Sequence, residues 1–324
     1  MDDRHSLTGG LRLFAVYVTL NDEPFIEASL ESVYPFAEKI FVLTAYDTTW
    51  DGTKVAPDRT LENVLAFEDP EKKICCIKMW CPDEALARNW VMHAALHSIE
   101  YKFIPHAFGR AEIDEWLEPP DYFWIVDGDE IYDPESVPHI LQFVRNSGVG
   151  HVKVYGYVYF RTWNYRVRDP EPFTAFVRPG RYLGFARDPV YPRILGYLQM
   201  IPRIGARLFD RVVGRACVPP EVGVFHHPAY VGETQRIANK LAHSAHRHQV
   251  VEGWIERVWE PWTPSSRNFH PTDPPAFPEA VFVPTEQLPR LVRERKWPQG
   301  YLGEIPEPAS PRPLEKDETR SQSC

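Results

Sequence analysis

An apolar run in the middle of the chain ends in three acidic residues, in the segment DYFWIVDGDEIYDP (121–134). The preceding Phe-Trp-Ile-Val is typical of a strand buried on both faces, and ligands collect at the carboxyl ends of such strands in open α/β sheets. Carboxylate oxygens there suit a hard divalent cation, Mg²⁺ or Mn²⁺, bridged to a phosphate. Asp127, Asp129 and Glu130 are therefore candidates for a metal site, although acidic residues also simply open turns.

Two shorter motifs precede this segment. Residues 46–53 read YDTTWDGT, a run of small and polar residues that can form a tight turn beside a ribose or a base. In ALARNW, Arg88 and Asn89 fall near a predicted helix start, where an arginine can bind a diphosphate. The structural alternatives are an Asx-type turn in the first motif and a surface pair between Arg88 and Glu84, four residues earlier, in the second.

The elements that must position these motifs alternate between strands and helices. Strands are predicted over 11–19, 39–46, 74–80 and in the acidic segment. A first helix follows the Asn-Asp-Glu-Pro cluster after the first strand, with apolar residues at helical spacing. Asp83 caps a second helix that runs to about residue 99, and its predicted buried face consists of Leu86, Trp90 and Ala94. This order predicts an α/β fold with a mostly parallel sheet flanked by helices.

The second half of the chain has a different pattern. Residues 151–160 alternate between valines and tyrosines, which predicts an antiparallel, half-exposed strand. Short strands are expected over 206–213 and 222–227, and a helix over 233–250. Proline is dense from Pro261 onward, which favours coil that wraps the body of the protein.

These patterns predict a domain organisation. We expect a catalytic domain over 1–260, with a nucleotide-binding half (1–135) and a smaller antiparallel acceptor half (136–260). A Pro-rich wrapping segment (261–303) and a disordered polar tail (304–324) would follow.

Composition limits the classes of function. The chain has 324 residues, 44% of them hydrophobic, and its formal net charge of −9 argues against a nucleic-acid partner. Its five cysteines have neither the density of a disulfide framework nor zinc-ligand spacing. The N-terminus lacks a signal-peptide pattern, and the apolar runs are too short to span a bilayer. We therefore expect a cytoplasmic protein without a transmembrane segment, with peripheral membrane contact left open.

Four motifs in this order resemble those of the inverting family-2-like glycosyltransferases with the GT-A fold. In this chain they are LNDE (20–23), DTTWDGT (47–53), ARN (87–89) and DGDE (127–130), and the last stands where that family has its DxD cluster. The resemblance covers roughly the first half of the chain. Two residues depart from the family pattern: Leu20 replaces a usual tyrosine, and Trp50 lies inside the turn. The acceptor-side ED pair and the QxxRW motif of the processive members are not evident.

The resemblance implies a role for each matched residue. Three residues would border the base and ribose of the nucleotide: Asn21, Glu23 and Asp47. Arg88 would approach the pyrophosphate, and Asp127 would contact the ribose or the metal. Asp129 would ligate Mn²⁺ or Mg²⁺, which neutralises the leaving nucleoside diphosphate.

The second half resembles a looser pattern of related bacterial transferases, in which a strand ends in histidine and a lysine-bearing helix follows. These are VGVFHHPAY (222–230) and ETQRIANKLAHSAH (233–246) here. Strand alternation puts His226 and His227 on opposite faces, so at most one of them serves the site. We choose His227 for the metal or diphosphate and Lys240 for a phosphate. The alternative is a surface histidine pair. Three further histidines are interpreted as a solvated helix face, since no zinc set is completed: His243, His246 and His248.

Inverting transfer also needs a carboxylate that takes the proton of the acceptor hydroxyl. Glu221, just before the histidine strand, is the candidate, with Asp188 and Asp210 as rivals. Five aromatic residues could offer a platform for an acceptor sugar, although cross-strand packing is the favoured explanation for them. They are Tyr155, Tyr157, Tyr159, Trp163 and Tyr165.

The sequence thus predicts metal-dependent transfer of a sugar from a nucleoside-diphosphate sugar to an unidentified carbohydrate, lipid-linked or protein acceptor, with inversion. A sugar nucleotidyltransferase would carry a Gly-rich, basic loop after its first strand, where this chain has LNDEP (20–24). A non-catalytic carbohydrate-binding or scaffold protein would keep the fold without turnover, and the intact DGDE acids argue against it. Phosphoester hydrolysis is the weakest alternative, because a paired-histidine metal set is not evident.

Overall fold

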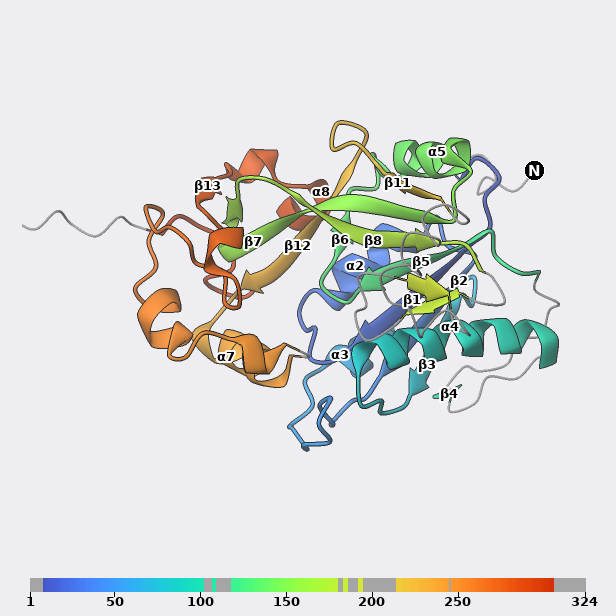
Figure 1. Cartoon of the computed structure of the whole chain (residues 1–324), viewed down its shortest axis with the longest axis horizontal. Coiled ribbons are helices and arrows are strands. Elements are labelled where there is room, and N and C mark those ends of the chain that lie inside the picture. The colour runs from blue at the N-terminus through green and yellow to red at the C-terminus, as the bar shows by residue number, and fades with distance from the viewer. Residues whose placement is uncertain are drawn as a thin grey trace, which may run out of the picture.

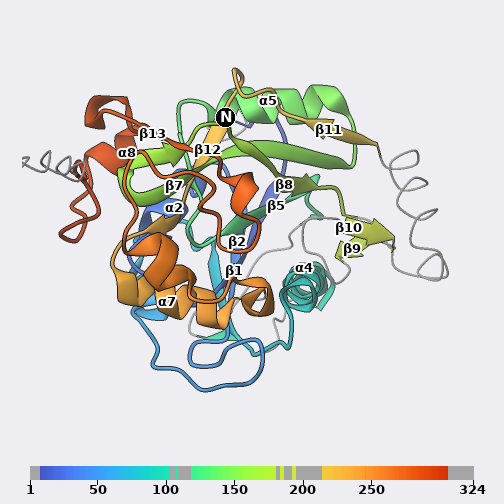
Figure 2. The same cartoon turned by 60° about the vertical axis from the view of Figure 1, so that its left-hand side comes forward.

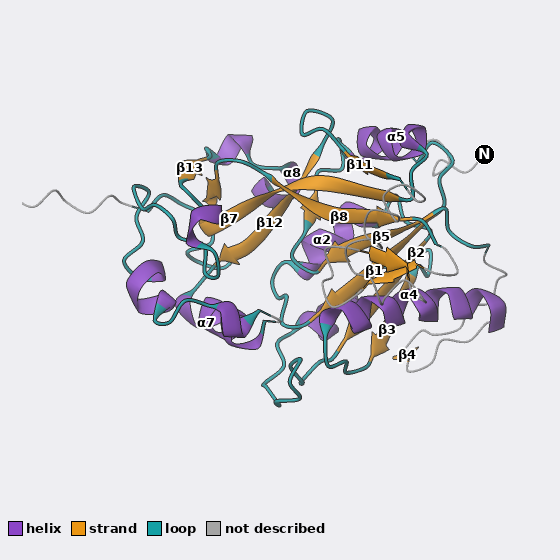
Figure 3. Ribbon diagram, in the orientation of Figure 1, coloured by secondary structure: helices purple, strands orange, loops and turns teal. Residues whose placement is uncertain are grey.

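A large mixed sheet with helices on both faces forms the body of the protein (Figure 1, Figure 3). The computed structural model describes residues 8–101, 107–108, 118–179, 183–185, 192–194, 214–244 and 246–305. The fold class is α/β, as predicted. None of the helices in these ranges is long and apolar enough to cross a membrane.

Four parallel strands make the core of the sheet, in the order β3-β2-β1-β5. They are β1 (Leu13–Thr19), β2 (Lys39–Thr44), β3 (Ile74–Lys78) and β5 (Tyr122–Asp127), and all four were predicted. Val18 of β1 pairs with Asp127 on one side and Leu43 on the other, so these strands end at one edge of the sheet. The short β4 (Ala107–Phe108) is antiparallel to β3 at the outer border.

The other half of the sheet is built on β7 (His151–Val167). This strand is antiparallel to β8 (Glu171–Val177) and parallel to β12 (Val224–Val231), so the predicted antiparallel strand is longer than expected and its pairing is mixed. Two more strands pair with β7, β11 (Arg215–Cys217) and β13 (Ala280–Phe282), and β6 (Ile131–Tyr132) is antiparallel to β12. A separate pair consists of β9 (Leu183–Phe185) and β10 (Pro192–Ile194).

Side chains along each strand alternate between the two faces of the sheet, so both faces carry apolar residues, and helices cover both. Trp124 packs in a cluster with α2 (Ile26–Val33), α3 (Thr60–Ala66) and α5 (Val137–Ser147), whereas Phe123 packs with α4 (Glu84–Tyr101). Neither α3 nor α5 was predicted.

The predicted start of α4 is confirmed, but its predicted buried face is partly wrong. Asp83 Oδ1 accepts a hydrogen bond from the Leu86 backbone N–H at 2.7 Å, which is the expected cap. The Leu86 side chain is 45% exposed, while Ala87, Val91 and Ala95 are buried. The buried stripe is therefore made mostly of small residues, which give a weak hydrophobic signal in the sequence.

The chain after β12 forms the side of the molecule that Figure 2 brings forward. Helix α7 (Thr234–His243) is shorter than predicted and is followed by η2 (Arg247–Gln249) and a π-helical turn, η3 (Ile255–Trp259). Downstream lie η4 (Pro274–Ala276), η5 (Thr285–Gln287) and α8 (Arg290–Arg293). The expectation of coil throughout 261–303 is wrong at β13, whose Val281 pairs with Arg166 of β7. The strand predicted over 206–213, Asp188, Asp210 and residues 306–324 lie outside the described residues.

An aromatic cluster fastens this C-terminal part to the sheet. Phe160 of β7 is fully buried, and the centroids of four aromatic rings from the C-terminal part lie within 6.1 Å of its own: Trp254, Trp259, Trp262 and Phe269. Ile237 and Leu241 of α7 belong to the same cluster. The apolar side of α7 is thus held against β7 and β12, which leaves its polar side to face the carboxyl ends of β1 and β5.

Candidate functional site

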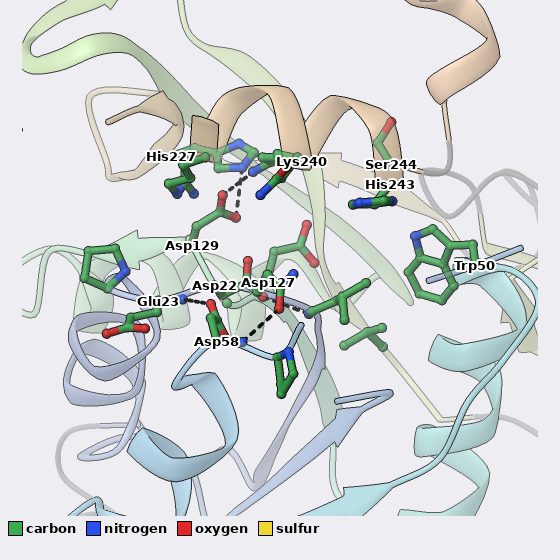
Figure 4. A pocket seen from close by; sticks show the side chains of 18 of the residues that line it. Asp22, Glu23, Trp50, Asp58, Asp127, Asp129, His227, Lys240, His243 and Ser244 are labelled. Carbon is green, nitrogen blue, oxygen red and sulfur yellow. Dashed lines mark hydrogen bonds and ion pairs between the residues drawn. The ribbon is translucent and has the colours of Figure 1, made fainter. Parts of the chain in front are cut away.

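A cavity of about 550 Å³ lies between the carboxyl ends of β1 and β5 and the polar side of α7 (Figure 4). Four aspartates at a strand end or in the loops after the strands form what we call the acidic floor: Asp22, Asp58, Asp127 and Asp129. Four side chains from one side of the helix form the α7 wall: Arg236, Asn239, Lys240 and His243. Their spacing of three, one and three residues keeps them on one helical face. The cavity is thus acidic on the strand side and mostly basic on the helix side.

The DGDE turn is shaped by its glycine. A Cβ at Gly128 would lie 2.5 Å from Asp22 Oδ2, so glycine is needed for the loop after β1 to approach the loop after β5. The Glu130 backbone N–H donates to the Asp127 carbonyl at 3.0 Å, and Glu130 Oε2 accepts from the Asp127 N–H at 3.3 Å. Burial, together with the charge of Asp127, raises the pKa of Glu130 well above its usual range. Glu130 therefore stabilises the turn from the protein interior and does not line the cavity.

Asp129 is the most enclosed acid of the floor, with a side chain only 4% exposed. Its Oδ2 is 2.5 Å from Lys240 Nζ, and its Oδ1 is 3.2 Å from His227 Nε2 (Figure 4). Burial alone would raise the pKa of Asp129, but the Lys240 ammonium and His227 lower it well below its usual range. Asp129 is therefore an ionised carboxylate bound to two donors that come from β12 and α7.

A buried arginine that does not line the cavity binds the Asp127 carboxylate. Arg88 on α4 donates to Asp127 Oδ1 at 2.5 Å and to Glu84 Oε1 at 2.7 Å. The arginine is 6% exposed, and despite its burial the two carboxylates raise its guanidinium pKa. It pairs with Glu84, but as a buried residue and not as the surface arginine of the alternative explanation, and it also binds Asp127. Since Arg88 does not line the cavity, its contact is with Asp127 rather than with the open space.

The other two acids of the floor come from different loops, Asp22 from the loop after β1 and Asp58 from the loop between β2 and α3. Asp22 Oδ2 accepts from the Leu20 N–H at 3.2 Å, and Asp58 Oδ2 accepts from the Glu23 N–H at 2.9 Å. Asn21 has a positive φ of 59°, which asparagine tolerates better than most residues, and its Oδ1 accepts from the Asp58 N–H at 3.4 Å. Burial and the charge of Asp129 raise the pKa of Asp22 well above its usual range. Asp22 therefore contributes less negative charge to the floor than its neighbours.

The structure brings most of the sequence-predicted site residues to one place. Six of them line the cavity: Asn21, Glu23, Asp127, Asp129, His227 and Lys240. His226 points to the other side of β12, where its Nδ1 is 2.8 Å from the Tyr159 hydroxyl and burial lowers its pKa to about 3. Of the two histidines, His227 is therefore the one that lines the cavity.

Two predicted residues other than Arg88 are not brought to the cavity. Asp47 lies in the turn after β2, where Lys54 Nζ is 2.9 Å from its Oδ1. Glu221, the sequence-predicted general base, lines a separate shallow groove beside α5, together with His139 and Phe143. The reason is topological, because Glu221 precedes β12 and lies at the opposite end of that strand from the α7 wall.

The sequence prediction gave no site role to several other residues of the cavity. Asp22 stands within the LNDE motif but was interpreted as part of a helix start, and Asp58 and Glu84 belong to no motif. Arg236 and His243 share a helical face with Lys240, a periodic signal that was available in the sequence. Trp50, the departure from the family pattern, also lines the cavity (Figure 4).

The donor set at this place is suited to a divalent cation. No group of three or more His, Cys, Asp or Glu side chains within the described ranges is already arranged around a cation. However, Asp129 Oδ1 and His227 Nε2 are 3.2 Å apart, close to the roughly 3 Å between adjacent ligands of an octahedral ion at about 2.1 Å. Asp127 adds a second carboxylate on the same side. His227 Nδ1 is buried without a hydrogen-bond partner in the described part of the chain, so the carboxylates are the better-supported ligands.

Comparisons with known proteins give no family for this chain. No protein-family model matches it, and no curated protein matches its sequence. Among solved structures, glucosyl-3-phosphoglycerate synthase from Mycobacterium tuberculosis matches in its complex with Mn²⁺, UDP and phosphoglyceric acid and in its complex with Mn²⁺ and UDP-glucose. Each shows 17% identity over 48% of this chain and 46% of that chain, with a TM-score of 0.30. A crystal structure described as a mycobacterial protein has 17% identity over 48% of this chain and 44% of that one, with a TM-score of 0.31. The matches span less than half of either chain, and at this likeness they assign no function.

Proposed function

We propose that the protein is a glycosyltransferase of GT-A type that transfers a sugar from a nucleoside-diphosphate sugar with the help of Mn²⁺ or Mg²⁺. The observation that carries the proposal is the meeting of three separate sequence motifs at one cavity. The LNDE loop, the DGDE turn and the His227/Lys240 pair come from different parts of the chain and line the same space. Ligand binding at the carboxyl ends of parallel strands is the general rule for open α/β sheets.

Each residue of the site has a proposed task. Asp129 and Asp127 hold the cation, with His227 beside them, and Arg88 orients Asp127 from behind. When bound, the cation neutralises the charge that develops on the leaving diphosphate. Lys240 contributes a further positive charge to the same group, because its ammonium lies next to Asp129. Asn21 and Glu23 contact the base and ribose from the loop after β1.

The proton of the acceptor hydroxyl must pass to a carboxylate within hydrogen-bonding reach, about 3 Å. Glu221 lines a different groove, so we propose that an acid of the cavity takes this role. Glu23, Asp58 and Glu84 line the cavity and are the candidates. Transfer with inversion is proposed on the resemblance of the four motifs alone.

The test is a thermal-shift panel of UDP, GDP, CMP and dTDP sugars, each with and without Mn²⁺. A ligand that binds only the folded protein stabilises it by about 2.7 kcal/mol at one hundred times its Kd. We expect at least one donor to raise the melting temperature in the presence of Mn²⁺, and we expect Asp129→Asn to abolish that increase. Asp47→Asn is the matched control, since it removes a carboxylate that does not line the cavity. If no donor shifts the melting temperature with Mn²⁺ present, the protein is instead a scaffold that has kept the fold.

A further inference from the structure

Both oxygens of the Asp129 carboxylate are already engaged by positively charged or donor groups. Lys240 Nζ lies 2.5 Å from Oδ2, and His227 Nε2 lies 3.2 Å from Oδ1 (Figure 4). The carboxylate is 4% exposed, so water competes little for these contacts. A cation that binds either oxygen of Asp129 therefore comes next to one of these two groups, even where it uses the second lone pair of that oxygen.

Lys240 is the group that can leave. Its side chain is 33% exposed and has a flexible four-carbon stem, whereas that of His227 is 14% exposed and packed edge-on against the Phe173 ring. The charges point the same way. An ammonium 2.5 Å from a metal-binding oxygen would repel a divalent cation.

The displaced ammonium needs a new negative partner. If Lys240 left Asp129 without gaining such a partner, part of the ion-pair energy would be lost. A cation that arrives alone therefore has to compete with Lys240. A diphosphate bound to the same cation would bring negatively charged oxygens to the space beside α7, where Lys240 already lines the cavity. The Lys240 ammonium then exchanges one negatively charged partner for another, and the lost ion pair with Asp129 is replaced.

We propose that Lys240 couples the two ligands by holding Asp129 closed to a divalent cation until a diphosphate arrives to accept its ammonium. This proposal rests on the proposed metal-and-diphosphate site. The coupling is reciprocal, so the cation strengthens diphosphate binding by the same factor as the diphosphate strengthens cation binding. Coupling between two ligands is typically about 5- to 150-fold. The device prevents the site from filling with a cation that has no donor substrate attached.

The experiment measures Mn²⁺ affinity from the electron paramagnetic resonance signal of the free ion. Wild type and Lys240→Met are titrated with Mn²⁺ alone and again with inorganic pyrophosphate, after subtraction of the complex that Mn²⁺ and pyrophosphate form in solution. We expect Lys240→Met to bind Mn²⁺ alone more tightly, by about 5- to 150-fold. We also expect it to lose most of the enhancement that pyrophosphate gives the wild type.

Lys54→Met is the matched control. It removes another ammonium from an aspartate, since Lys54 pairs with Asp47 at 2.9 Å, but neither residue lines the cavity. Its Mn²⁺ affinity should equal that of the wild type. If folded Lys240→Met binds Mn²⁺ alone no more tightly than the wild type, the coupling proposal is wrong while the proposed function stands. If the wild type binds no Mn²⁺ with pyrophosphate or with any donor of the thermal-shift panel, the proposed function fails and takes the coupling with it.

Discussion

The acidic floor and the α7 wall face each other across one cavity but are built differently. Backbone N–H groups and a buried guanidinium hold the floor, as for Asp58, which accepts from the Glu23 N–H, and Asp127, which accepts from Arg88. The α7 wall consists of side chains on a helix whose N-terminus has no side-chain cap. The difference indicates that the floor is preorganised for its ligands, whereas the wall adjusts to them.

The largest expected effect concerns the support of the α7 wall. Phe160→Ala would open a void inside the aromatic cluster that also holds Ile237 and Leu241, at a cost of about 3–5 kcal/mol in the free energy of unfolding. Urea denaturation measures this loss. The control Phe282→Ala, on the partner strand β13 with a side chain 45% exposed, should cost less than about 1 kcal/mol. Equal losses of unfolding free energy in the two variants would mean that the aromatic cluster does not stabilise the α7 wall.

The next effect concerns the floor. Arg88→Met leaves Asp127 and Glu84 without the guanidinium between them, and removing one member of a buried ion pair costs about 3–5 kcal/mol. Because the Asp127 side chain is 33% exposed, we expect a loss nearer to about 2–3 kcal/mol in urea denaturation. The double variant Arg88→Met/Asp127→Asn should recover part of it. A fully stable single variant would show that the floor does not depend on this pair.

A smaller effect is the dependence of stability on pH. Burial lowers the pKa of His151 on β7 to about 3, with the nearby Arg215 adding to the shift, and burial lowers that of His226 on β12 to the same value. The unfolded chain binds protons at these sites from about pH 6.5 downward, while the folded chain does not until about pH 3. Stability should therefore fall on acidification through this window, by up to about 1.4 kcal/mol per pH unit for each histidine.

Urea unfolding at pH 7, 6 and 5 measures this slope. His151→Gln should flatten it, since the amide can replace the 3.0 Å hydrogen bond to Thr174 Oγ1 without titrating. An unchanged slope in the variant would assign the acid sensitivity to other groups. Because β7 and β12 carry α7, acid should weaken the support of the wall.

The sequence predicts the floor better than the wall because the floor consists of strand ends. A buried strand followed by acids is visible in one dimension, and the parallel order of β1, β2 and β5 brings their ends together. Alternation along β12 was enough to separate His227 from His226. Asp22 was interpreted as a helix start because its contact with Gly128 depends on two loops that meet only in the fold.

The α7 wall and the general base could not be predicted from the sequence in the same way. The role of Lys240 depends on how α7 crosses the edge of the sheet, which the buried cluster around Phe160 determines. Glu221 is close to the histidines in sequence, but the length of β12 separates it from them in space. The buried face of α4 was misjudged at Leu86 because the real stripe contains small alanines that hardly stand out from the pattern.

The central claim is that Asp129 binds a divalent cation that activates a nucleotide sugar. The direct measurement is the Mn²⁺-dependent hydrolysis of the donor that gives the largest thermal shift, compared among the wild type, Asp129→Asn and the control Asp47→Asn. Metal stabilisation of a leaving group supplies several kcal/mol, so we expect Asp129→Asn to lower the rate by on the order of 100-fold or more. Asp47→Asn should keep the wild-type dependence on Mn²⁺. Full Mn²⁺-dependent hydrolysis by Asp129→Asn would contradict the account.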